Sequence, residues 1–533
     1  MTALPIPVAE FLPELVVLVG ALLVFLADTL GLVRRRVEVF GAFSLASLGI
    51  GIVLVLADLG TAGLGALRTL PASAVDTAVS TSALYAFTSL GLVFQVIFLL
   101  AAFLVSLASL SRSSDERGAS IFFGLLLIAT VGMMLATTAA DLIFLLLAIE
   151  VTGISTYLLV GYTRKDARGI EAAMKFYIVG ALSTAISFFG ASLLFGAFGS
   201  TNLVVLAQAT TPVAYPDLAL VGYALLIAGV GFKLTLVPFH MWAVDVYDGA
   251  PTDVTAFLAG GSKKVGLFGF FLIFLGPVAL TVGRGVGCSG GGCVPYNFAP
   301  TLQIALGIAA VLTMTVGNVL ALLQKEMKRM LAYSSISQAG YMLLGIAIGT
   351  APALAGATLQ VFAHVFMKAG AFLVVAGVAG LGIGPLIDDW RGLGLKRPYL
   401  SVAFAFMLLS LAGIPLTIGF ASKFVLFSSA VEAQGAFVWL AVAGLLNSAL
   451  SVFYYARVLK VMFLDRPEVT PAGTPLVVAG GSGAGDLAVG GLGWGRAAAI
   501  GLAAVAIVAF GVDPQPVLSG IQSAATHFLA TGA

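Results

Sequence analysis

The sequence has 533 residues, of which 60% are hydrophobic and 9% are charged, whereas a soluble globular protein carries about 25% charged residues. This composition excludes a water-soluble globule and indicates an integral membrane protein. The 26 Lys and Arg residues nearly balance the 24 Asp and Glu residues, for a net charge of +2, which excludes the basic field that nucleic-acid binding requires.

Fourteen apolar stretches are long enough to cross a membrane as helices, at about 20 residues per crossing. In chain order they lie at about 11–31, 38–58, 84–110, 119–138, 140–162, 171–197, 217–237, 253–278, 301–323, 331–349, 354–380, 399–428, 436–463 and 495–514. The sequence therefore predicts an all-α polytopic membrane protein with about 14 transmembrane helices.

Lys and Arg residues collect in alternate predicted loops. Eighteen of them lie in the odd-numbered loops, whereas the even-numbered loops and the two tails hold only Arg68 and Arg284. Because the cytoplasmic loops of membrane proteins are enriched in Lys and Arg, we predict that the odd-numbered loops are cytoplasmic and that both termini lie outside.

The chain has only two Cys and three His residues. They are too few to ligate an iron–sulfur cluster, or a haem beside a structural zinc, so we expect neither a cofactor nor a metal site in this chain. Cys288 and Cys293 fall in the Gly-rich eighth loop, which the predicted topology places outside. We predict a small disulfide there, and two unpaired cysteines are the alternative.

The basic residues outside the loops are six lysines within predicted spans, namely Lys175, Lys233, Lys263, Lys264, Lys368 and Lys423. A lysine at the centre of a membrane helix costs about 2.5–3.5 kcal/mol, so we expect these residues to be paired or used. Lys175 lies close enough to a helix end to extend to the membrane surface instead. Lys263 lies near the midplane, and Lys264 points about 100° away from it, so only one of the two should face a polar axis.

Glu150 is the one acid that the predicted spans place at mid-depth. An unpaired carboxylate there would be neutralised, whereas a nearby lysine would keep it charged. We therefore predict an intramembrane ion pair of Glu150 with Lys175 or Lys233, and a purely structural polar contact between helices is the alternative. A desolvated lysine can release its proton while arginine keeps its own, so such a pair suits proton transfer.

Two predicted spans contain Gly and Pro beside a lysine, at 229–240 and 412–423. Broken helices at membrane depth line cavities or are buried in protein, and paired breaks in two halves indicate transport sites. A packing kink without function is the alternative.

The two halves also share short strings, such as Leu234-Thr235 and Leu416-Thr417. We therefore predict two five-helix repeats of opposite membrane orientation. The predicted divisions are N-terminal helices at 1–118, a first repeat at 119–278, a second repeat at 301–463, and a Gly-rich loop with the last helix at 464–533.

Two histidines lie beside these features. His364 is four residues before Lys368 and so shares its helix face, and His240 follows the first break. We predict that both relay protons between lysines. A packed, hydrogen-bonded histidine without function is the alternative for each.

Four features carry a resemblance to a known family. They are Pro238-Phe239-His240-Met241-Trp242, Asp245-Val246-Tyr247-Asp248-Gly249-Ala250-Pro251-Thr252, Glu150 before Ser155-Thr156-Tyr157-Leu158-Leu159-Val160-Gly161-Tyr162, and Gly413-Ile414-Pro415 before Lys423. They resemble the antiporter-like membrane subunits of respiratory complex I, which are related to multisubunit cation/proton antiporters and membrane-bound hydrogenases. The second string looks like the subunit N version and is quite specific. The match covers most of the chain, and it is best at about 119–463.

The resemblance implies a proton-translocating membrane subunit of a type I NADH-quinone oxidoreductase in the bacterial cell membrane, without a redox cofactor of its own. Flavin, iron–sulfur clusters and quinone are then expected in partner subunits. The implied partners are other membrane subunits, including sister antiporter-like subunits, and indirectly the peripheral NADH-oxidising arm. Family positions with a functional Glu or Lys fall on Glu150, Lys175, Lys233, Lys263 and Lys423. Lys264, the Cys-containing loop and the Gly-rich stretch at about 470–495 depart from the family pattern.

We hypothesise that redox work elsewhere in such a complex drives a proton along buried groups of this chain. The path would run from Glu150, Lys175 and Lys233 through Lys263, His364 and Lys368 to Lys423. Two other functions stay open: a subunit of a Na⁺/H⁺ antiporter or membrane-bound hydrogenase, and a scaffold that does not pump.

Overall fold

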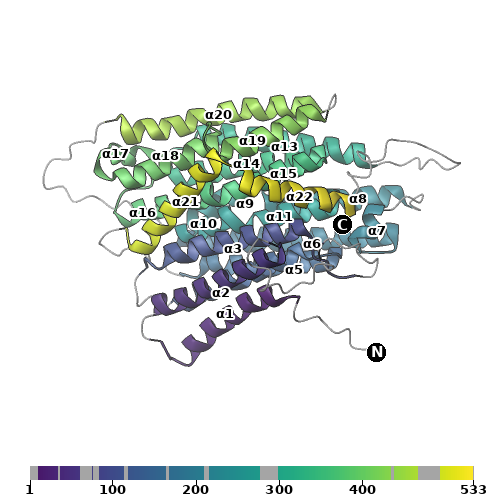
Figure 1. Ribbon diagram of the computed structural model, residues 1–533, viewed down its shortest axis with the longest axis horizontal. Helices are drawn as coiled ribbons and strands as arrows, with labels where there is room; N and C mark the ends of the chain where they lie inside the picture. Colours follow the sequence, from purple (N-terminus) through teal and green to yellow (C-terminus); the bar gives the residue numbers. More distant parts are fainter. Residues whose placement is uncertain are drawn as a thin grey trace.

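The computed structural model describes residues 10–33, 36–60, 75, 83–112, 118–163, 167–208, 215–275, 298–433, 437–465 and 492–531. Within these ranges the regular structure is helical, accompanied by four isolated β-bridges. Figure 1 shows the helices packed side by side, with most of their axes roughly parallel to the long axis of the molecule, as expected for a polytopic membrane protein. Cys288 and Cys293 lie outside the described residues, so the disulfide stays a prediction.

The helices of the N-terminal half follow the predicted order. The first three are α1 (Leu12–Thr29), α2 (Arg36–Asp58) and α3 (Ser89–Ser109). The next group comprises α4 (Ala119–Thr137), α5 (Leu142–Gly161), α6 (Ala167–Phe198), the short α7 (Leu203–Gln208), α8 (Pro216–Leu234), α9 (Met241–Gly249), α10 (Thr252–Phe257) and α11 (Lys264–Phe270). Two π-helical segments, η3 (Leu258–Ser262) and η4 (Phe271–Leu275), interrupt and end the last crossing of this group.

The C-terminal half begins with α13 (Phe298–Leu322), α14 (Met327–Ile348), α15 (Ala351–His364), the π-helical η5 (Val365–Ala369) and α16 (Gly370–Gly380). A short connection holds the 3₁₀ turn η6 (Ile387–Trp390) and α17 (Leu393–Lys396). The remaining helices are α18 (Pro398–Ala412), α19 (Ile418–Glu432), α20 (Val438–Phe463), α21 (Trp494–Val512) and α22 (Gln515–Thr531).

Thirteen helices in the described part of the chain are long and apolar enough to cross a membrane, against the fourteen predicted. The difference is the predicted span at 399–428, which is divided into α18 and α19 of 15 residues each. Each half is shorter than the roughly 20 residues of a full crossing, so the two together form one broken crossing. The other predicted break is also present, between α8 and α9. In chain order, each break falls in the fourth crossing of its predicted five-helix unit.

Burial separates a core of helices from a shell. The most apolar stretches of the crossings Thr252–Phe274 and Ala351–Gly380 are 100% buried within the chain, whereas those of α1, α2 and α6 are 33% buried. Lys263, Lys264 and Lys368 lie in the two fully buried crossings. These three lysines, whose exposure to lipid would cost free energy, are thus shielded from lipid by the chain itself.

A buried ion cluster joins three parts of the chain at the side of the basic loops. Arg112, just after α3, approaches Asp253 on α10 with its Nε 3.2 Å from Oδ2, and Nη2 of Arg496 on α21 lies 3.3 Å from the same oxygen. The three side chains are 5%, 1% and 8% exposed. The Arg112 guanidinium also lies 4.1 Å from the ring centroid of Phe122. Both arginines had counted only as loop charges in the sequence, but they connect the first three helices, the core and the last crossing.

Replacing Asp253 with Asn should destabilise the fold, because two buried guanidinium groups lose their carboxylate. Breaking a buried pair in this way costs about 3–5 kcal/mol. Thermal unfolding of the purified protein in lipid nanodiscs measures the loss. The control is Asp388→Asn, whose carboxylate is 72% exposed beside Arg391 and whose loss should change stability by about 1 kcal/mol or less. Equal stability of the two variants would contradict a structural role for the cluster.

Candidate functional site

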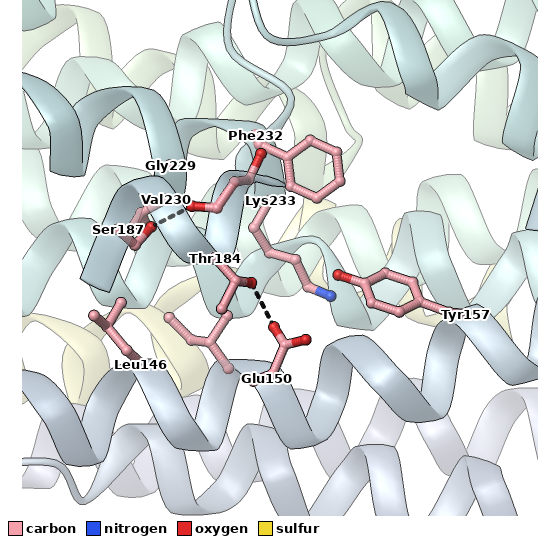
Figure 2. A pocket seen from close by; sticks show the side chains of 11 residues that line it. Leu146, Glu150, Tyr157, Thr184, Ser187, Gly229, Val230, Phe232 and Lys233 are labelled. Carbon is pink, nitrogen blue, oxygen red and sulfur yellow. Dashed lines mark hydrogen bonds between the residues drawn. The ribbon is translucent and has the colours of Figure 1, made fainter. Parts of the chain in front are cut away.

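A small cavity lies between α5, α6 and α8, and Figure 2 shows its lining. Its polar groups are those of Glu150, Tyr157, Ser183, Thr184, Ser187 and Lys233. The Glu150 carboxylate accepts a hydrogen bond of 2.6 Å from the hydroxyl of Thr184. In Figure 2 the Lys233 side chain extends into the space between Glu150 and Tyr157. The cavity therefore brings together an acid and a lysine that the sequence predicted as partners.

The acid and the lysine face one cavity without direct contact. The Lys233 ammonium has no hydrogen-bond partner among the described residues. It lies 5.8 Å from the ring centroids of both Tyr157 and Phe176, where the negative ring faces attract a cation. The predicted pairing of Glu150 with Lys233 thus needs a bridging water or a side-chain movement, and the cavity supplies the room.

The end of α8 explains why Lys233 lacks a partner. The helix stops at the next residue because Thr235 has a left-handed conformation, with φ of 64°. The N–H groups of Thr235 and Leu236 donate to the carbonyls of Phe232 and Gly231. These backbone acceptors at the break are therefore already occupied, and the lysine side chain turns to the cavity.

Close packing of α8 against α6 depends on Gly229 at the cavity wall. A Cβ atom at this position would lie 2.0 Å from the Ser187 hydroxyl oxygen and 2.7 Å from the Ser183 carbonyl. Only glycine permits this approach, so the spacing of the cavity walls is fixed by the absence of a side chain.

Lys175 does not reach Glu150, which corrects that part of the predicted pairing. Its side chain is 45% exposed, and its ammonium pairs with Glu171 at 2.7 Å and with Asp245 at 3.1 Å. Arg329 joins the same group, 3.3 Å from Asp245. The physical reason is the one expected of a lysine near a helix end, whose flexible side chain extends toward solvent-accessible acids.

The π-helical segments place three lysines at the contact between the two halves. η3 packs on η5, and a Cβ atom at Gly260 would lie 2.7 Å from the Cβ of Ala369. Lys263 and Lys264 directly follow η3, and Lys368 lies within η5. All three side chains are buried. Both halves therefore contribute lysines to one buried region.

Oxygen atoms of neutral groups surround these ammonium groups. Lys263 donates to the carbonyl and the hydroxyl of Ser335, at 3.0 and 3.2 Å. Lys368 donates to the hydroxyl of Ser334 at 2.6 Å and also to a carbonyl of α14. Lys264 instead donates to the carbonyl of Ala259 in η3. Lys263 thus faces the second half of the chain, whereas Lys264 is bound to its own crossing.

The two predicted histidines occupy different surroundings. His364 is fully buried, and neither of its ring nitrogens has a hydrogen-bond partner among the described residues. It lies one turn before Lys368 at the start of η5. His240 precedes α9, is only partly buried, and has no partner for Nδ1 in the described part of the chain. A role in proton transfer stays a prediction for both.

The second break forms a cage of oxygen atoms around Lys423. The carbonyls of Leu411 and Ala412, at the end of α18, accept hydrogen bonds of 2.9 and 3.1 Å from the ammonium. The hydroxyl of Ser448 accepts a third at 2.9 Å, and the Tyr341 ring centroid lies 4.7 Å away. Because the last carbonyls of a helix lack N–H partners, the break itself provides acceptors for the cation.

Polar side chains between Lys368 and Lys423 were not predicted from the sequence. Ser334 shares a hydrogen bond with the Tyr455 hydroxyl. Gln338, one turn further along α14, donates to the carbonyl of Leu411 at 3.2 Å, the same carbonyl that Lys423 uses. Gln360 and Ser422 extend this network from α15 and α19. One sequence feature could have indicated this network. It is the polar string Ser334-Ser335-Ile336-Ser337-Gln338, which lies inside an apolar span.

Comparisons with known proteins show the family of the chain. The family model of the transmembrane region of NADH:quinone oxidoreductase and Mrp antiporter subunits matches residues 139–283 and 292–451. The chain is 42% identical over 384 residues to the F420H2 dehydrogenase subunit N of Methanosarcina mazei, covering 70% of this chain and 74% of that protein. It is also 42% identical over 381 residues to the NADH-quinone oxidoreductase subunit N of Trichlorobacter lovleyi, with the same two coverages of 70% and 74%.

Solved structures show the same fold over nearly the whole chain. A chain of respiratory complex I from Thermus thermophilus, with bound aureothin, superimposes with a TM-score of 0.71 at 30% identity, covering 95% of this chain and 99% of that one. A chain of the Mrp complex from Dietzia has a TM-score of 0.77 at 20% identity, covering 100% of both chains, and this match concerns the fold alone. The chain therefore belongs to the transmembrane family of NADH:quinone oxidoreductase and Mrp antiporter subunits.

Proposed function

We propose that this chain moves protons across the membrane as the subunit N-type member of an NADH-quinone oxidoreductase complex. The observation that carries the proposal is the row of buried ammonium groups of Lys233, Lys263, Lys368 and Lys423. No ion pair among the described residues includes any of the four. A buried cation held by neutral oxygens and ring faces alone is suited to giving up a proton.

The cavity at Glu150 and Lys233 is the first station of the proposed path. It has room for about one water molecule beside these polar groups. Water between the two groups would link them, and approach of the carboxylate would stabilise the ammonium charge. Separation of the pair would favour transfer of the proton toward Lys263.

The central and last stations lie around α14 and the second break. Lys263 and Lys368 donate to the adjacent residues Ser335 and Ser334 on α14. From there the hydroxyl of Tyr455 and the amide of Gln338 extend toward the cage of Lys423. The hydroxyls both accept and donate, so they can pass a proton between lysines, together with waters where side chains do not touch.

The electron transfer belongs to partner subunits in this proposal. The relatives are named as subunits of NADH-quinone oxidoreductase and of F420H2 dehydrogenase, so flavin, iron–sulfur clusters and quinone would reside in the other subunits. Sister antiporter-like subunits would be membrane neighbours, and the peripheral electron-donating arm would act indirectly. The basic loops support a cytoplasmic placement of their side in a bacterial plasma membrane, with both termini outside.

Isolation of the tagged chain in mild detergent tests complex membership. We expect a large native-gel band with inhibitor-sensitive NADH:quinone reductase activity and with flavin and iron–sulfur subunits identified by mass spectrometry. A band without this activity, but with small antiporter subunits and sodium-dependent proton flux in liposomes, would overturn the proposal in favour of cation exchange.

Replacing Lys233 with Ala should abolish most proton pumping, because the cavity then holds no basic group to exchange a proton with Glu150. Proton uptake into inverted membrane vesicles, driven by NADH and divided by the rate of NADH oxidation, measures the effect. Lys460→Ala is the control, since this lysine is exposed at the end of α20 and should leave the proton yield unchanged. An unchanged yield in the Lys233 variant would remove that residue from the path.

The Ser334→Ala and Tyr455→Phe variants should each slow proton transfer between Lys368 and Lys423. Each removes one hydroxyl with little change of shape. The Ser334 hydroxyl binds the Lys368 ammonium, and loss of a hydrogen bond to a charged group is worth about 1.5–3 kcal/mol, or roughly tenfold to a hundredfold in rate. The Tyr455 hydroxyl binds the neutral Ser334 hydroxyl, so its loss is worth about 0.5–1.5 kcal/mol, or about tenfold or less in rate. The measurement is the pumping rate in proteoliposomes. Ser401→Ala is the matched control, because Ser401 is buried but its hydroxyl has no partner among the described residues. Similar rates in all three variants would exclude a relay through these hydroxyls.

A further inference from the structure

The last crossing of the chain is also broken. α21 ends at Val512 and α22 begins at Gln515, so Asp513 and Pro514 separate two helices. A proline has no N–H and its ring collides with the preceding turn, which stops α21. Asp513 accepts a hydrogen bond of 3.1 Å from the N–H of Gln515 at the start of α22. From the sequence we predicted one span at 495–514 in this part of the chain, and α22 lies beyond it.

Ring contacts of Phe510 set the depth of this break. Its ring centroid lies 5.3 Å from that of Phe362 and 6.5 Å from that of Phe366. Phe366 lies at the centre of the 30-residue crossing Ala351–Gly380. Phe510 therefore lies level with the middle of that crossing.

A second contact gives the same depth. A Cβ atom at Gly511 would lie 2.4 Å from the Cα of Thr417, in the break between α18 and α19. Asp513 is three residues beyond Phe510, which is about 4.5 Å along a helix. The Asp513 carboxylate at the end of α21 thus lies near the level of the break between α18 and α19.

α22 has an apolar buried face and a polar exposed face. Its buried side chains are Leu518, Ile521, Ala524, Ala525 and Phe528, and the helix packs on α15 and α3. The opposite, exposed face carries Gln515, Ser519, Gln522, Ser523 and Thr526, with Gly520 and His527 exposed at its edge. We call these five residues together with Asp513 the polar face of α22.

The exposed surface of the neighbouring helix α21 is apolar. Its exposed large residues are apolar, with Leu502 47% and Val505 65% exposed. α21 is thus suited to lipid or to an apolar neighbour, whereas the polar face of α22 is not. Asp513 forms no ion pair with any described residue of this chain, and a lone carboxylate at the centre of a membrane costs about 2.5–3.5 kcal/mol.

We propose that the polar face of α22 is the docking site for a transmembrane helix of a neighbouring membrane subunit, which carries a Lys or Arg opposite Asp513. Charge complementarity selects the cation, and a partner helix with hydroxyl or amide side chains satisfies Gln515 and Gln522. Gly520 lies at the edge of this surface, and an added Cβ there would meet nothing of this chain within 4 Å. Together with Ser519 it lets a second backbone approach closely.

Site-specific photo-crosslinking in the purified intact complex tests the proposal. A benzophenone amino acid replaces Ser519 or Gln522, and Val505 on α21 is the control position. We expect adducts at the first two positions with a membrane-spanning segment of one other subunit, and mass spectrometry should find a Lys or Arg in that segment. Adducts with phospholipid alone, or a partner segment without a basic residue, would overturn the proposal.

Two variants separate docking from folding. Asp513→Lys places like charges opposite each other, so recovery of the crosslinked subunit with the tagged chain should fall at least about tenfold. Gly520→Leu favours the helix of this chain but fills the space for the partner, so it should also release that subunit while the amount of folded chain stays the same. Retention of the subunit at the original level in both variants would contradict the docking site.

Discussion

The structure depends on the need of buried ammonium groups for oxygen partners. Most carbonyls inside a membrane helix already accept hydrogen bonds from N–H groups four residues further along, and Lys263 and Lys368 each share one such carbonyl of α14. Interruptions of the helices solve this problem at two places. The end of α18 presents to Lys423 two carbonyls that lack backbone N–H partners, and the π-helical segment η3 presents the carbonyl of Ala259 to Lys264. The breaks are thus part of the site itself and more than flexible joints.

The two breaks are related but have different consequences. At the end of α18 the lysine is surrounded by three oxygen acceptors and one aromatic ring. At the end of α8 the N–H groups after the break occupy the nearest carbonyls, and Lys233 faces a cavity with Glu150 on the other side. The first station can therefore change its partner, whereas the last holds its cation in a fixed cage. The two predicted repeats thus differ in how the lysine beside each break is surrounded.

Sequence patterns predicted the residues and helix breaks whose placement inside a membrane costs free energy. Lysines inside spans and Gly-Pro breaks beside them stand out in any apolar sequence, and both are where they were expected. Ser334, Gln338 and Tyr455 did not stand out, because hydroxyls and amides are common in helices and only packing decides what they contact. Arg112 and Arg496 were counted only among the basic loop residues, and their burial beside Asp253 follows from the packing of α21 on α3. The second half of the last crossing was missed because one face of α22 is polar.

The central claim is that protons pass along the row of four buried lysines, and Lys368, the third of them, offers the most direct test. In Lys368→Met the side chain keeps nearly its length and apolar stem but cannot bind a proton. The number of protons moved per NADH oxidised, measured with the purified complex in proteoliposomes, should fall while NADH oxidation in uncoupled vesicles continues. An unchanged proton number in this variant would show that the path does not use the lysine row.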